Sequence, residues 1–168
     1  MKKELRNIAL VSVLSVVFFF AGVANVTAQQ YEGLKGVFSV KAVFDMRIGD
    51  PKSAALHLDV INMTFKDKDI AELTNDPNFV VVFIGPSVKL VSKNREGFSA
   101  EDNQSLAKIA TTISKMSKEG VKFEICMLAA NLFGVDPASI LPEIKQVPNG
   151  FISLLVYQAK GFGLVPVY

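Results

Sequence analysis

Short β-rich runs alternate along the chain with longer stretches whose apolar residues recur at helical spacing. The β-rich runs are residues 37–46, 78–84, 121–126, 143–147 and 163–168. The helical stripes include Ala54, Leu58, Ile61 and Phe65, then Leu106, Ile109, Ala110, Ile113 and Met116. Shorter helices are expected after residue 126, near 138–141 and over 151–159. This β-α-β order predicts an α/β fold, with about five mostly parallel strands and helices on both faces.

Local signals place the ends of several elements. Asp50 followed by Pro51 is a typical helix start, and Ser99 with Asp102 three residues later resembles a capping box. Residues 66–69 read as a charged connection. The β-branched and aromatic content of 151–159 leaves a strand open there. Pro166 predicts that the last strand lies at a sheet edge.

The stretch 121–134, VKFEICMLAANLFG, holds the single cysteine. Its first part alternates apolar and charged residues, which is the pattern of a half-buried strand. By that parity Val121, Phe123 and Ile125 share one face, while Lys122, Glu124 and Cys126 share the other. An apolar and small run follows and ends at Gly134, which predicts a short helix. Cys126 therefore falls at a strand-to-helix junction.

Two interpretations of Cys126 follow from this position. The unpaired N–H groups at a helix start favour a thiolate, which is the nucleophilic and sulfur-accepting form of cysteine. Alternatively, a free cysteine packs as a small buried hydrophobe. The spacing leaves both interpretations open.

The first thirty residues have the layout of a secretory signal peptide. Lys2, Lys3 and Arg6 precede the apolar run 8–24, and Val26-Thr27-Ala28 resembles a cleavage site. We therefore expect a signal peptide at 1–28, one domain at 29–168, and an exported protein, periplasmic if the source is Gram-negative. A retained membrane anchor is the alternative, since the run approaches the length of a spanning helix.

Charge and cysteine count exclude several functions. Residues 1–28 hold three of the 18 Lys and Arg and one of the 16 Asp and Glu, so the remainder carries 15 of each and no net charge. This balance predicts neither a nucleic-acid partner nor a membrane partner after cleavage. One cysteine and one histidine are too few for a typical transition-metal site, and no nucleotide-binding glycine motif occurs. No cofactor is expected.

Four residues are weaker candidates for the rim of a pocket near Cys126. Gly85 and Ser87 follow the buried run 78–84, where the carboxyl end of a parallel strand faces a ligand crevice. His57 and Asn62 lie on the first predicted helix. Plain turn chemistry for the first pair, and a boundary position for His57, are the simpler interpretations.

The chain resembles the DsrE/DsrF-like family of small sulfur-relay proteins, in its exported branch. The matching segments are VFDMRIGDPKSAALHLDVINMTFKD, FVVVFIGPSVKLV, GVKFEICMLAANLFGV and VPNGFISLLVYQAKGFGLVPVY, with GVKFEIC as the best marker. The resemblance implies a flavodoxin-like domain that assembles into trimers or hexamers. It also implies that Cys126 carries sulfur as a persulfide between a donor and an acceptor, either partner proteins or small sulfur compounds.

The sequence is compatible with two functions. The first is an exported persulfide carrier or sulfurtransferase-like protein acting through Cys126. The second is a non-catalytic oligomeric binding module, of unknown ligand, in which Cys126 is buried.

Overall fold

Five parallel strands form a single sheet in the computed structural model, which describes residues 31–73 and 78–168. The strands are β1 (Lys41–Met46), β2 (Asn78–Phe83), β3 (Lys122–Cys126), β4 (Ile144–Val147) and β5 (Gly163–Val167). They lie in the order β4-β3-β2-β1-β5. Residues Gly33–Tyr168 form one compact unit. The expected signal peptide, 1–28, lies outside the described residues.

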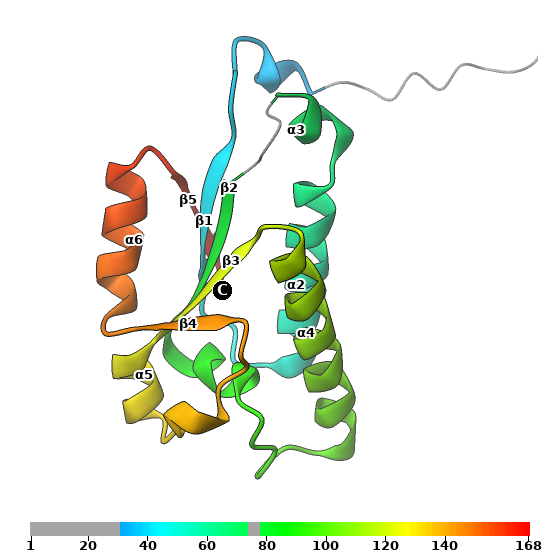
Figure 1. Ribbon diagram of the computed structural model, residues 1–168. Coiled ribbons are helices and arrows are strands. Elements are labelled where there is room, and N and C mark those ends of the chain that lie inside the picture. Colours follow the sequence, from blue (N-terminus) through cyan, green and yellow to red (C-terminus); the bar gives the residue numbers. More distant parts are fainter. Residues whose placement is uncertain (1–30, 74–77) are drawn as a thin grey trace, which may run out of the picture. The chain divides into compact units, whose positions relative to one another are not determined.

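Helices cover both faces of this sheet, as the sequence predicts. They are α2 (Pro51–Phe65), α3 (Lys68–Leu73), α4 (Ala100–Lys118), α5 (Met127–Leu132) and α6 (Gly150–Ala159). Short 3-10 segments are η2 (Glu32–Leu34), η3 (Gly85–Val91) and η4 (Pro137–Ser139). Helices α2 and α4 pack side by side on one face, and α6 lies on the other (Figure 1). The reason is that the chain moves from β1 to β2 to β3 in one direction and then returns from β4 to β5 across the opposite face.

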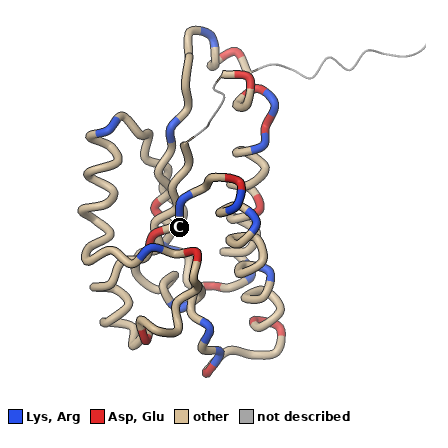
Figure 2. The backbone as a smooth tube through the Cα atoms, in the orientation of Figure 1, with Lys and Arg blue, Asp and Glu red and all other residues tan. Residues whose placement is uncertain are grey.

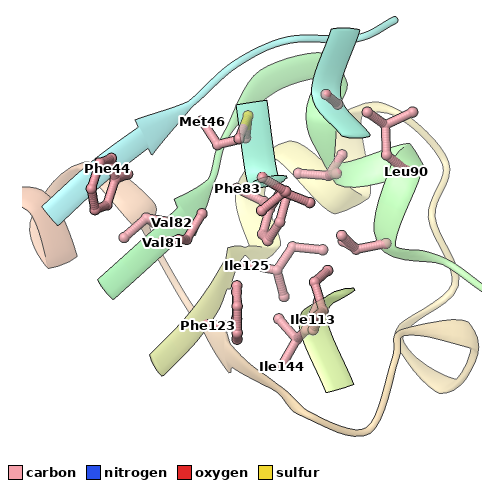
Figure 3. Packing of buried hydrophobic residues seen from close by; sticks show 14 of the residues in the cluster. Phe44, Met46, Val81, Val82, Phe83, Leu90, Ile113, Phe123, Ile125 and Ile144 are labelled. Atoms are coloured by element: carbon pink, nitrogen blue, oxygen red, sulfur yellow. The ribbon is translucent and has the colours of Figure 1, made fainter. Parts of the chain in front are cut away.

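The core lies between the sheet and the α2–α4 pair, with β2 at its centre. Every β2 residue after Asn78 is at most 2% exposed, as expected for a strand covered on both faces. Phe83 stacks on Phe123 with ring centroids 6.5 Å apart, and Ile125 and Ile113 pack nearby (Figure 3). The continuous apolar run 78–84 is therefore a central strand, which confirms its prediction.

The predicted parity of β3 is confirmed, but its half-buried character is not. Val121, Phe123 and Ile125 are buried in the core, as expected. Glu124, on the other face, is also buried, at 5% exposed. That face is covered by α6, which a pattern local to β3 does not reveal.

Most element boundaries follow the predicted signals. Asp50 caps α2 by accepting from the Ser53 amide at 2.7 Å, and Ser99 and Asp102 form a capping box. Residues 151–159 form a helix and not a strand. The prediction of a charged connection at 66–69 was wrong in part, because α3 begins at Lys68. The first strand begins at Lys41, later than the predicted residue 37. The edge position of β5 is confirmed.

Candidate functional site

Cys126 is the last residue of β3 and the N-cap of α5. Its backbone is extended, with φ −73° and ψ 111°, and its side chain makes no capping hydrogen bond. It pairs in register with Val147 of β4. The residue is 2% exposed, so the thiol is enclosed in the described conformation.

The first turn of α6 lies directly over Cys126. A Cβ atom placed on Gly150 would lie 2.8 Å from the Cys126 Cβ and 2.9 Å from the Ile84 Cγ1. Since real Cβ atoms do not approach this closely, only glycine fits at this position. The backbone of Gly150 therefore forms a cover that fits tightly over the cysteine. This first turn therefore covers one side of the Cys126 side chain.

A hydrogen bond joins the C-terminal half of α6 to strand β3. The Tyr157 hydroxyl donates to Glu124 Oε1 at 3.0 Å, while Glu124 Oε2 is buried and has no hydrogen-bond partner among the described residues. Burial raises the pKa of Tyr157 to about 12, with further contributions from the hydrogen bond and the charge of Glu124. Glu124 lies two residues before Cys126 on the same face of β3.

A second contact holds α6 near its start. The Arg47 guanidinium stacks over the Phe151 ring at 4.9 Å, and its Nε donates to both carboxylate oxygens of Asp45, at 2.9 and 3.0 Å. Asp45 is 3% exposed. The two buried carboxylates of the α6 side, Asp45 and Glu124, thus each bind a group attached to or stacked on α6.

Gly85 and Ser87 lie at the same end of the sheet as Cys126, because they follow β2. Gly85 adopts φ +65°, which glycine tolerates best. Ser87 is fully buried, and its hydroxyl donates to the carbonyls of Met46 at 2.7 Å and Ile84 at 3.0 Å. That hydroxyl therefore closes the turn after β2 and does not face a crevice.

His57 and Asn62 lie on α2, across the sheet from α6 and Cys126. His57 lines an apolar groove of about 550 Å³ together with residues of β1, β5 and the C-terminus, among them Phe44, Val165 and Tyr168. Its Nδ1 is 2.8 Å from the Ser53 carbonyl oxygen, so Nδ1 carries the proton. Asn62 Oδ1 is buried without a hydrogen-bond partner among the described residues. The structure does not bring either residue to the cysteine.

Sequence reasoning missed Gly150, Glu124 and Tyr157 as neighbours of this site. The parity of β3 did place Glu124 on the face of Cys126, but nothing local indicated which helix covers that face. Among residues 31–73 and 78–168, no cluster of three His, Cys, Asp or Glu side chains is arranged to hold a metal ion. Within the same residues, no helix is long and apolar enough to cross a bilayer.

Comparison with known proteins identifies the class of protein. The family model of the DsrE/DsrF-like family matches residues 41–166. The chain therefore belongs to the DsrE/DsrF-like family, a family associated with sulfur relay in general.

One sequence relative and two solved structures are similar to this chain. An uncharacterized protein of Aquifex aeolicus (strain VF5) is 27% identical over 128 residues, covering 76% of this chain. The match covers 56% of that relative, so this chain corresponds to little more than half of it. The structure of MTH1491 from Methanobacterium thermoautotrophicum, a protein of unknown function, matches with a TM-score of 0.59 at 16% identity, over 76% of this chain and 99% of that one. The E. coli ychN protein matches with a TM-score of 0.47 at 9% identity, over 77% of this chain and all of that one.

Proposed function

We propose that this protein carries sulfane sulfur as a persulfide on Cys126. The observation that carries the proposal is the position of the single cysteine, at the carboxyl end of an inner strand in a family associated with sulfur relay. Ligand sites of open α/β sheets lie at this end of the strands.

The proposed transfer needs no cofactor and no net oxidation. The Cys126 thiolate attacks the outer sulfur of a donor persulfide, a new S–S bond forms, and the donor's S–S bond breaks. The electron pair of the broken bond leaves with the donor as its thiolate. An acceptor thiolate then attacks the outer sulfur on Cys126, and the Cys126 thiolate is regenerated.

Burial of the thiol sets a condition on this chemistry. At 2% exposure Cys126 cannot meet a donor, so the proposal includes an opened state in which the first turn of α6 withdraws. Gly150 is the contact that must separate, and the Tyr157–Glu124 hydrogen bond is far enough along α6 to hold the rest of the helix in place.

The alternative is a non-catalytic binding module. Burial of Cys126 favours it, and so does the apolar groove beside His57, on the opposite face of the sheet. In this reading the cysteine is a core residue and the groove holds the ligand or partner.

Export and self-association complete the proposal. Removal of residues 1–28 would release a chain that retains the whole compact unit Gly33–Tyr168. Self-association would bury the exposed apolar side chains of α2 and β5 beside the His57 groove, among them Val60 and Val165. A sulfur donor and acceptor, protein or small molecule, would act at the other face.

Mass measurement on residues 29–168 tests the two functions. After exposure to polysulfide, the native protein should gain mass in steps of one sulfur, and Cys126→Ser should gain none. Alkylation of the native thiol should also proceed without denaturant. A thiol that gains no sulfur and reacts only after denaturation would establish the binding module.

A further inference from the structure

The outer surface formed by α6 and α5 is apolar and carries no charge. Neither helix contains a charged residue, as the uniform colour of α6 shows in Figure 2. Six large apolar side chains on them are between 42% and 82% exposed: Leu128, Leu132, Phe151, Ile152, Leu155 and Val156. The start of α5 lies beside the loop that leads into α6, since the Leu128 amide donates to the carbonyl of Pro148, two residues before α6. We call this the α5–α6 surface.

Exposed lysines lie on the α6 side of the sheet, at the end of α6 away from α5 and on β4. By strand parity, Lys41, Lys122 and Lys145 point to the α6 side of the sheet, and Lys160 follows the end of α6. All four are exposed. The acidic residues that the strands place on this side, Asp45 and Glu124, are buried and already bound to Arg47 and Tyr157. The exposed charge that the strands contribute to this side is therefore positive.

Some lysines of the opposite side have acidic partners, although Lys115 and Lys118 of α4 form no ion pair within the described residues. On the α2–α4 side, Lys66 pairs with Glu119 at 2.6 Å, Lys108 with Asp59, and Lys52 with Glu101 at 3.7 Å. No ion pair within the described residues involves Lys122, Lys145 or Lys160, and Lys41 lies over the Phe162 ring.

We propose that the α5–α6 surface binds an anionic lipid surface. Its aliphatic and aromatic side chains enter the boundary between headgroups and acyl chains, while the exposed lysines on the same side of the sheet meet lipid phosphates. This departs from the sequence expectation of no membrane partner, because that expectation averaged charge over the chain.

Charge and chemistry select this occupant over a protein. Pairing of the surface with the same surface of a second copy would bring two sets of lysines together, and like charges repel. Protein interfaces also supply about one hydrogen bond per 100–200 Å², whereas the six exposed side chains offer no polar atom. A lipid surface requires no directional bonds. The inference does not depend on sulfur chemistry at Cys126.

Vesicle sedimentation tests the proposal with the chain 29–168, which lacks the apolar N-terminal run. The protein should bind vesicles of equal parts phosphatidylglycerol and phosphatidylcholine, and should be released by salt. It should not bind phosphatidylcholine alone. The double variant Ile152→Ser/Leu155→Ser should lower the partition coefficient at least tenfold, because it removes inserted apolar area. Lys122→Gln and Lys145→Gln should each lower it roughly fivefold.

Matched controls lie outside this surface. Phe38→Ser removes an apolar side chain that is 86% exposed, and Lys52→Gln/Lys68→Gln removes two exposed lysines, so both should bind as the parent does. Absence of binding, equal binding to neutral vesicles, or equal losses in the controls would overturn the proposal. So would a result in which Ile152→Ser/Leu155→Ser abolishes self-association of a protein that ignores vesicles, since the surface would then be a protein interface.

Discussion

Tyr157 and Glu124 show how one hydrogen bond joins a partly buried hydroxyl to a buried carboxyl group. The carboxylate is 5% exposed and accepts from the Tyr157 hydroxyl alone, because its second oxygen has no hydrogen-bond partner among the described residues. A buried carboxylate with so few donors favours a neighbour that keeps its proton. Burial is the largest cause of the raised pKa of Tyr157, and the hydrogen bond and charge of Glu124 raise it further.

The raised pKa of Tyr157 predicts a loss of stability at high pH. The folded group ionises near pH 12 and the unfolded group near its ordinary 10.0, so the folded state binds the proton more tightly. Its contribution is fully present below pH 10 and is lost as pH rises toward 12. Tyrosinate absorbance should therefore show a late phase that Tyr157→Phe removes.

Glu124→Gln separates the causes of that shift. It removes the charge and weakens the acceptor while leaving most of the burial, so the pKa of Tyr157 should fall toward 10.0 without reaching it. Tyr168→Phe, which alters an exposed tyrosine, is the control and should leave the late phase in place. A Tyr157 titration that is unchanged in Glu124→Gln would show that the hydrogen bond has no influence on it.

The sequence predicts the position of Cys126 at a strand end, but it does not predict that Cys126 is buried. The strand-end position of Cys126 follows from the alternation of 121–126 and the apolar run after it, both of which are local. The burial of Cys126 depends on Gly150, which is 24 residues away and reaches it only because α6 returns across the sheet. For the same reason His57, on a helix of the other face, was predicted near a cysteine that it does not approach.

At the scale of elements, α6 is set on the sheet by close contact at its first residue. Gly150→Ala would place a Cβ 2.8 Å from Cys126, and neither backbone can yield without moving the helix. We expect a destabilisation of about 1–3 kcal/mol in urea unfolding, as for other overpacked sites. We also expect faster alkylation of Cys126, because the displaced turn uncovers the thiol.

Gly163→Ala is the matched control, since Gly163 also begins an element and its nearest non-neighbouring atom is the Lys41 carbonyl oxygen at 3.8 Å. That separation is an ordinary contact, so stability should change by much less and alkylation should stay at the parent rate. Equal effects of the two substitutions would mean that Gly150 is not a special cover over the cysteine.

Elements with strong local signals were predicted well, and those that depend on tertiary packing were not. Asp50, Ser99 and Gly134 mark helix ends through their own backbone or side-chain bonds, and the structure places helix ends beside them. Gly85 and Ser87 were interpreted as turn residues, yet they begin the 3-10 helix η3, in which Val88, Leu90 and Val91 are buried. Its apolar residues follow no helical stripe that a reader of the sequence could detect.

At the scale of the whole molecule, the two sides of the sheet differ in what they leave uncovered. The α6 side exposes the α5–α6 surface with unpaired lysines, while the α2 side exposes an apolar groove beside paired charges. The open edge of β5 lies next to that groove. Pro166 pairs in register with Asp45, and the carbonyl of Val167 accepts from Arg47, so Pro166 faces outward, where it offers no N–H to an added strand.

This geometry predicts association through side chains of the groove and not through strand addition. Val60 is 51% exposed and lines the groove with Val165 and Tyr168. Val60→Glu would bury a charge in any interface formed there, which is costly without a partner, so the assembly should shift toward monomer in sedimentation velocity. Leu155→Glu, at a side chain 66% exposed on the opposite side, should leave the assembly intact while weakening lipid binding. If the parent chain is monomeric at every concentration, or if Leu155→Glu dissociates it and Val60→Glu does not, the groove is not the subunit interface. Opposite responses of the two variants would assign one apolar surface to each partner, because each glutamate then affects only the contact made on its own side of the sheet.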